Sequence, residues 1–203
     1  MTSLELPKTT AYGRIIAKDK LFEYGGASRE LQDIVARQVG RIRWANKIAP
    51  STMNIAPDDE ISEIELIEME LRVPFKELDK RILPLVVKAI PYNLFFKLSG
   101  GEKAHYAVIY GGKAYHSETP PKIIGSGTKN VWENIVRQVA GIPFGETPIA
   151  DVIAENERVE KLSQQIEALE RKARAEKQPR RKLELAEELK KLKTEIKRIT
   201  VSE

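Results

Sequence analysis

Seven carboxylates lie between residues 58 and 70, and this stretch is the first place where the residue types suggest chemistry. They are Asp58, Asp59, Glu60, Glu63, Glu65, Glu68 and Glu70. Separated carboxylates hold Mg²⁺ in metal-dependent nucleases, in which a lysine orients the attacking water. Here the next basic residue is Arg72, which stays protonated and cannot act as a base. A nuclease site is therefore the lesser alternative, and we prefer an acidic loop that leads into a half-exposed strand.

The other residue types that support catalysis are rare in this sequence or lack the necessary spacing. The two histidines, His105 and His116, do not have the spacing of a metal site, and we expect each to be packed or to cap an element. The chain has no cysteine, which excludes disulfides, thiolate metal sites and cysteine nucleophiles. It contains neither a G-x-S-x-G nucleophile motif nor a phosphate loop ending in Gly-Lys-Ser/Thr. The sequence therefore predicts no catalytic residue, no metal ligand and no cofactor.

A cluster of basic residues lies near the C-terminus. It consists of Arg171, Lys172, Arg174, Lys177, Arg180, Arg181 and Lys182. Glu176 is the only acidic residue within it, so the local net charge is +6, whereas 34 basic and 30 acidic residues give the whole chain +4. A basic cluster on an exposed segment attracts phosphate groups or an acidic partner. The alternative is an ordinary solvated helix surface, which the lack of aromatic residues for base stacking favours.

Two stripes of apolar residues at heptad spacing flank this cluster. The first is Val159, Leu162, Ile166, Leu169 and Ala173, and the second is Leu185, Leu189, Leu192, Ile196 and Ile199. Pro179 lies midway, so that each residue of one stripe has a counterpart equally far away in the other. This symmetry predicts an antiparallel helical hairpin whose second helix begins at Pro179. A single kinked helix that dimerises the protein is the alternative.

Composition divides the chain into two predicted domains. Residues 151–203 contain no aromatic residue and no glycine, and they are rich in good helix formers. The run of helix breakers from Gly141 to Pro148 separates them from the first part. We therefore expect an α+β globular domain over residues 1–148 and a helical hairpin, or coiled coil, over residues 149–203.

Composition also narrows the class of protein. A hydrophobic content of 41% is enough for a core and excludes wholesale disorder. No apolar stretch is long enough to span a membrane, and the first residues lack the apolar core of an export signal. We expect a cytoplasmic protein without membrane contact.

Periodicity and turn residues predict the elements of the first domain. The expected helices cover residues 29–47, 76–90 and 130–140. The expected strands cover residues 61–73, 92–98, 103–110 and 113–117, and the last three form a β-meander. We expect Ser28 and Thr128 to cap the first and last helices, Pro84 to kink the second, and a bulge near Leu66 and Ile67. Together these elements predict an α+β fold with a mostly antiparallel mixed sheet and flanking helices.

Five segments of the sequence are distinctive in composition and order. They are Arg41–Asn54, Lys88–Tyr92, Tyr115–Glu118, Asn134–Gln138 and Lys177–Leu185. Together they resemble the prokaryotic family called domain of unknown function 4391, over nearly the whole chain. That family has no established activity, so the resemblance supplies no catalytic residue. Its motifs contain five candidates for lining a pocket: Trp44, Lys47, Asn54, His116 and Glu118.

The resemblance also implies a genomic context. Members of the family tend to be encoded beside helicases and DNA methyltransferases in restriction-like defence clusters. This context favours a non-enzymatic accessory subunit of a DNA restriction or phage-defence complex, which docks a helicase or methyltransferase and contacts DNA through the basic cluster. The alternatives are a metal-dependent nuclease and a structural protein that forms a homodimer through its C-terminal helices.

Overall fold

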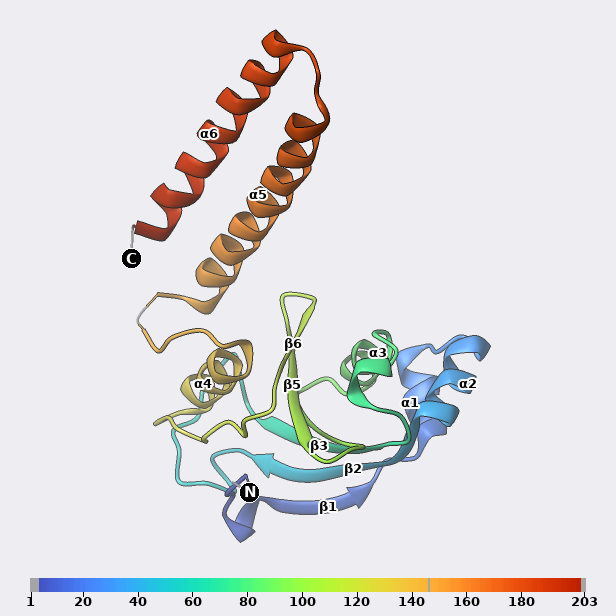
Figure 1. Cartoon of the computed structure of the whole chain (residues 1–203). Helices are drawn as coiled ribbons and strands as arrows, with labels where there is room; N and C mark the ends of the chain where they lie inside the picture. Colours follow the sequence, from blue (N-terminus) through green and yellow to red (C-terminus); the bar gives the residue numbers. More distant parts are fainter. Residues whose placement is uncertain (1–3, 146, 202–203) are drawn as a thin grey trace. The chain divides into compact units, whose positions relative to one another are not determined.

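A computed structural model describes residues 4–145 and 147–201, and the chain divides after Gly145 into two compact units. The first unit is built on a six-stranded mixed sheet, and the second is a pair of long helices (Figure 1). This arrangement confirms the predicted α+β class with a C-terminal helical hairpin. Within the described residues, no helix is both long enough and apolar enough to cross a membrane.

The strands of the sheet lie side by side in the order of the chain. They are β1 (Ala11–Ile15), β2 (Val39–Ile48), β3 (Ile64–Leu71), β4 (Asn93–Ser99), β5 (Ala104–Tyr110) and β6 (Lys113–Ser117). Neighbours are antiparallel, except that β3 and β4 are parallel. Parallel neighbours need a crossover connection, and helix α3 (Ile82–Ala89) lies within it. Strands β4 to β6 form the predicted β-meander.

The core of the sheet unit lies between the central strands and three helices, α1 (Lys18–Gly25), α2 (Arg29–Gln38) and α3. In β3 and β4 the residues of this core alternate along the chain: Ile67, Met69 and Leu71, then Leu94, Phe96 and Leu98. Residues of the opposite parity, such as Leu66, Phe95 and Val108, are buried as well. The middle of the sheet is therefore covered on both faces. Helix α4 (Thr128–Ala140) packs against β5 and β6, at the other end of the sheet from α1 and α2 (Figure 1).

The prediction of one helix over residues 29–47 is wrong in its second half, because α2 ends at Gln38 and the chain continues as β2. The buried residues of β2 recur at every third position, namely Val39, Ile42, Ala45 and Ile48. This spacing imitates the apolar face of a helix. The register against β3 shifts between Val39 and Ile42 and again between Trp44 and Asn46. Two irregularities in a strand thus convert a spacing of two into a spacing of three.

The predicted bulge at Leu66 and Ile67 is also misplaced. β3 pairs with β4 without interruption from Ile64 to Glu70, and the register shift lies on β2, opposite Leu66 and Ile67. The first four residues of β3 are all buried, because both faces of the strand are covered there. The change of apolar parity in the sequence therefore reflects burial on two sides.

The helix predicted over residues 76–90 is shorter than expected. A 3-10 helix, Phe75–Glu77, occupies the first part, and α3 begins only at Ile82. Pro84 consequently lies in the first turn of α3, where its missing N–H breaks no helical hydrogen bond. Helix α1, for which no helix was predicted, precedes α2.

The two predicted helix caps differ in outcome. Ser28 caps α2, since its Oγ accepts a hydrogen bond of 3.3 Å from the backbone N–H of Leu31. The N-cap of α4 is Gly127, so that Thr128 lies one residue inside the helix. The Oγ1 of Thr128 is buried without a hydrogen-bond partner among the described residues. Thr128 was therefore wrongly predicted as the cap.

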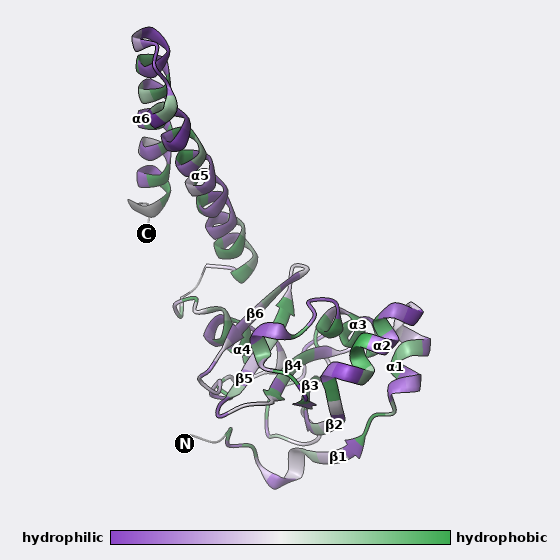
Figure 2. Cartoon of the chain, turned by 45° about the vertical axis from the view of Figure 1, so that its right-hand side comes forward, coloured by the Kyte–Doolittle hydropathy of each residue, from purple (hydrophilic) through white to green (hydrophobic). Residues whose placement is uncertain are grey.

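The second unit consists of α5 (Ile149–Ala175) and α6 (Pro179–Val201), which pack against each other as an antiparallel hairpin (Figure 1). Pro179 is the first residue of α6, as the sequence predicted. Ion pairs join the helices between Arg158 and Glu195 at 2.6 Å and between Glu170 and Lys193 at 2.7 Å. Hydrophobic and hydrophilic turns alternate along both helices (Figure 2).

Candidate functional site

The basic cluster forms the tip of the hairpin, where α5 ends and α6 begins. All seven of its basic side chains are exposed. Glu176 is held within the turn, because its carboxylate accepts the backbone N–H groups of Lys177 at 2.8 Å and Gln178 at 2.9 Å. The hydrogen bond from Gln178, followed by that from Lys177, lowers the pKa of Glu176 below its ordinary value. The only carboxylate inside the cluster is thus engaged by the backbone.

The cations of the tip are weakly neutralised. Three arginines reach carboxylates only at long range, in the pairs Arg174–Glu170 (3.8 Å), Arg180–Glu184 (3.7 Å) and Arg181–Glu176 (3.8 Å). Their side chains are 81%, 95% and 70% exposed, and surface pairs of this kind contribute little to stability. The other four cations have no ion-pair partner within the described residues: Arg171, Lys172, Lys177 and Lys182. The tip therefore offers most of its positive charge to the solvent.

The five residues predicted to line one pocket lie in separate places. Trp44 and Lys47 are on β2, whereas His116 lies on β6 and Glu118 directly follows it. Asn54 is exposed in the loop between β2 and β3. The five residues therefore belong to different places in the sheet unit, and two of these are described below, one around Trp44 and one around His116.

Trp44 and Lys47 contact two carboxylates at the start of β3. The Nε1 of Trp44 donates a hydrogen bond to Oε2 of Glu65, and Lys47 forms an ion pair with Glu63. Glu65 is 0% exposed, and its Oε1 has no hydrogen-bond partner in the described part of the chain. Burial raises the pKa of Glu65 to about 7, although the hydrogen bond from Trp44 opposes the rise. This carboxyl group is therefore partly protonated at neutral pH.

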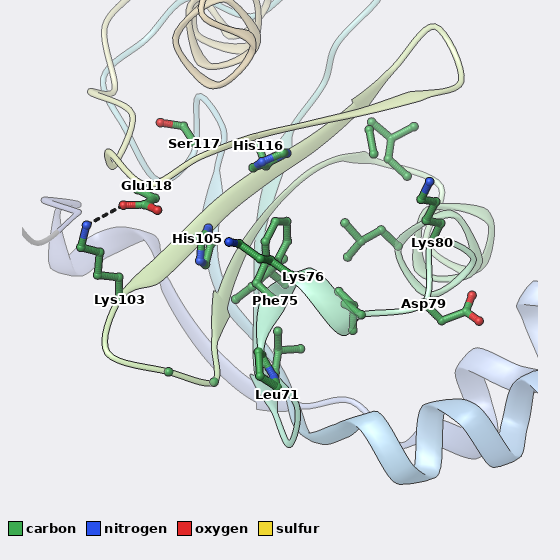
Figure 3. Close-up of a pocket in the computed structure, with 18 of the residues that line it drawn as sticks. Leu71, Phe75, Lys76, Asp79, Lys80, Lys103, His105, His116, Ser117 and Glu118 are labelled. Atoms are coloured by element: carbon green, nitrogen blue, oxygen red, sulfur yellow. Dashed lines mark hydrogen bonds and ion pairs between the residues drawn. The ribbon is translucent and has the colours of Figure 1, made fainter.

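His116 lines a cavity of about 1060 Å³ between the β4–β6 meander and the segment that leads into α3 (Figure 3). Its apolar lining includes Leu71, Leu78, Leu83, Leu98 and Ile109. The ring of Phe75 stacks on His105 with centroids 4.3 Å apart and an interplanar angle of 15°. The ring of His116 meets the same phenyl ring at 4.9 Å and 51°. Phe75 thus joins two imidazoles from neighbouring strands into one array of rings.

Charged side chains surround this array. The acidic ones are Asp79, Glu102 and Glu118, and the basic ones are Lys76, Lys80, Lys103 and Lys113. Lys103 binds Glu118 at 2.7 Å and lowers the pKa of that carboxyl group. Arg81 binds Asp79 at 2.8 Å, and its hydrogen bonds lower the pKa of Asp79 to about 2. Two of the three carboxylates are therefore neutralised within the protein.

His105 differs from the other polar groups of the cavity. Its Nδ1 atom is buried and has no hydrogen-bond partner among the described residues. Burial lowers the pKa of His105 below its ordinary value, and the charges of His116 and Lys103 act in the same direction against that of Glu118. The imidazole is therefore neutral at pH 7, with one nitrogen available for a hydrogen bond.

Comparison with known proteins identifies a family. The sequence model of the family described as Domain of unknown function (DUF4391) matches residues 4–196. The chain belongs to this family. The match includes the whole sheet and most of the hairpin, so both units are part of what DUF4391 members share. No curated protein and no solved structure matches this chain.

Asp58 and Glu70, at the two ends of the acidic stretch of the nuclease alternative, lie in separate places in this DUF4391 protein. Asp58 lies in the loop before β3, where its carboxylate accepts the backbone N–H of Glu60 at 2.9 Å. Glu70 lies near the end of β3 and faces Arg41 at 3.8 Å. Across residues 4–145 and 147–201, no three His, Asp or Glu side chains are arranged to hold a metal ion. The nuclease stays a prediction.

Sequence reasoning missed Phe75, left His105 as a packed residue, and named Glu65 only as one of the seven carboxylates of the acidic stretch. A signal existed for the histidine, because a hairpin turn at residues 111–112 places His116 opposite Ala107 and therefore on the same face as His105. Glu65 interrupts an apolar run in β3, which indicates a carboxylate with a special environment. Nothing local marks Phe75, since it reaches the sheet from a separate segment.

Proposed function

We propose that this DUF4391 protein is a non-enzymatic accessory subunit of a DNA restriction or phage-defence complex. It docks a helicase or a DNA methyltransferase subunit, and the tip of its hairpin contacts the DNA backbone. The observation that carries the proposal is the exposed cluster of seven basic side chains at the turn between α5 and α6, none of which forms a close ion pair with a described residue.

The chemistry of the tip suits a ligand with closely spaced negative charges. Lysine and arginine side chains that neutralise phosphates release condensed counterions, which supplies most of the affinity for nucleic acid. The hairpin has no aromatic residue on which a base could stack. Contact with DNA would therefore be made to the phosphates and would be independent of sequence.

A protein partner is supported by an apolar residue beside the cations. Leu183, which follows Lys182 on α6, is 63% exposed. An exposed leucine beside these basic side chains combines apolar contact with positive charge, and protein interfaces use both. The homodimer stays a prediction, and light scattering at high concentration tests it, since a monomer would exclude it.

The first experiment is a pull-down of the tagged full-length chain from its native host, with and without added nuclease. We expect a helicase or methyltransferase in both samples, because the contact is made by protein. Recovery that is lost on nuclease treatment would show that DNA alone bridges the two proteins. If no partner is recovered in either sample, the accessory role is refuted.

The second experiment measures DNA binding by the tip. In the variant Arg180→Glu, Arg181→Glu, Lys182→Glu we expect affinity for duplex DNA to fall about tenfold or more, with a shallower dependence on salt. The matched control is Lys161→Glu, Lys190→Glu, Lys191→Glu, which reverses three exposed cations of the same helices away from the tip. Unchanged affinity in the first variant, or an equal loss in both, would contradict a role for the tip in DNA binding.

A further inference from the structure

The cavity around Phe75, His105 and His116 has the size and lining of a small-molecule site. Its volume of about 1060 Å³ is ample for a small ligand. Aliphatic side chains and one phenyl ring form its apolar lining, and charged side chains and histidines line the same cavity. This combination of an apolar wall and a few polar groups is typical of sites that bury one organic molecule.

The charges that remain after internal pairing are mainly positive. Glu118 forms an ion pair with Lys103, and Asp79 forms one with Arg81. The carboxylate of Asp79 points away from the rings (Figure 3). Lys76 and Lys80 have no hydrogen bond or ion pair with any described residue. Lys80 lies on the α3 side of the rings, whereas the Lys103–Glu118 pair lies on the opposite side (Figure 3). Lys76 points toward His105, and its charge helps to lower the pKa of Glu118 (Figure 3). An anionic group on the α3 side would therefore supply the partner that Lys80 lacks among the described residues.

The rings offer a flat surface with hydrogen-bonding capacity. Phe75 holds both imidazoles in contact with its own ring, which restricts their orientation. His116 is exposed, so one face of its ring is open to a stacking partner. The buried Nδ1 of His105 lacks a hydrogen-bond partner among the described residues. A planar ligand that carries hydrogen-bonding groups would satisfy both features.

We propose that this cavity binds a nucleoside phosphate. The base stacks on His116 beside Phe75, and the phosphate binds Lys80 on the α3 side of the rings (Figure 3). The ligand is either a free nucleotide or the phosphorylated end of a DNA strand, which share this chemistry. The inference is independent of the hairpin tip, because it involves only residues of the sheet unit.

Isothermal titration calorimetry on the full-length chain tests this site. The probes are the four common ribonucleoside monophosphates, with adenosine and inorganic phosphate as the two halves of one ligand. We expect saturable binding of at least one monophosphate with Kd below about 1 mM, and binding about tenfold weaker for either half alone. No binding by any monophosphate would overturn the proposal, and equal affinity for inorganic phosphate would overturn the stacking of the base.

Variants assign the binding to the cavity. Lys80→Glu, and separately His116→Ala, should each weaken binding about tenfold or more. Both side chains are exposed, so folding is expected to survive, and circular dichroism checks it. Lys122→Glu is the control, because Lys122 is an exposed lysine of the same unit that does not line the cavity. Binding that the cavity variants leave unchanged would refute this location.

A 5′-phosphorylated trinucleotide separates the two sources of the ligand. About tenfold tighter binding than the best monophosphate would support a strand end, and weaker binding would support a free nucleotide. The pull-down and the tip variants do not involve the cavity. A failure of the nucleotide site is therefore distinguishable from a failure of the accessory role.

Discussion

In the sheet unit Phe95, Phe96 and Leu98 are 0% exposed, whereas in the hairpin Leu162 is the most deeply buried residue of the described heptad positions, at 9%. The sheet unit draws its core from strands and helices that are far apart in the sequence. The hairpin draws its smaller apolar seam from two neighbouring helices and adds ion pairs across them. The comparison teaches that the sheet unit depends on long-range packing, whereas the hairpin depends chiefly on local helix formation.

The difference also separates the two proposed roles. Ligand chemistry in the sheet unit requires side chains from separate segments, as Phe75, His105 and His116 show. The hairpin requires only that basic residues be close in sequence and exposed. A surface for DNA or a protein partner can therefore reside in a small and simple unit, while a cavity requires the larger one.

The largest expected effect compares the same substitution in both units. Leu98→Ala should lower the free energy of unfolding by about 3–5 kcal/mol, because it leaves a cavity in a fully buried layer. Leu189→Ala should cost about 1–2 kcal/mol, because the side chain is only half-buried. Denaturation followed by tryptophan fluorescence reports the sheet unit alone, since Trp44 and Trp132 both lie there, and circular dichroism adds the hairpin. If Leu98→Ala and Leu189→Ala shifted the fluorescence transition equally, the two units would not differ in their dependence on core packing.

The next effect concerns pH, which should act on the sheet unit through Glu65. Its folded pKa of about 7 lies above the ordinary value of 4.5, so the folded state binds the proton more tightly, and stability falls as the pH rises from 4.5 to about 7 and levels off above. The Glu65→Gln variant should equal the native protein near pH 4 and exceed its unfolding free energy by up to about 3 kcal/mol at pH 8. Urea titrations at both values measure this. Glu167→Gln on α5, where the side chain is exposed, should leave the pH dependence unchanged. A native protein equally stable at both values would contradict the prediction.

The smallest expected effect on stability compares two neighbouring glycines, Gly100 and Gly101, in the turn between β4 and β5. A Cβ atom at Gly100 would lie 2.5 Å from the Cβ of Leu71, whereas one at Gly101 would meet nothing within 4 Å. Gly100→Ala should therefore cost about 1–3 kcal/mol through overpacking. Gly101→Ala should change stability by less than about 0.5 kcal/mol. Thermal melts measure the stability of both variants. Similar melting temperatures would show that the turn accommodates a Cβ atom at Gly100 without cost.

Some elements of this protein could be predicted from the sequence, and others could not. The hairpin was predictable, because the heptad stripes and Pro179 lie within two consecutive helices. The meander was predictable as well, since its glycine-containing turns connect strands that pair with their neighbours in sequence. Strand β2 was not, because its buried residues follow irregularities that only its pairing with β3 reveals.

By itself the sequence determined the α+β class, the hairpin, the cap at Ser28 and the basic tip. These features depend on residues within a few turns of one another, whose spacing directly reflects the geometry of a helix or a tight hairpin. Only the tertiary structure decided that Glu65 is buried beside Trp44 and that Phe75 joins His105 to His116. The physical reason is that these contacts depend on strand register and on packing between segments 20 to 40 residues apart, which no local periodicity records.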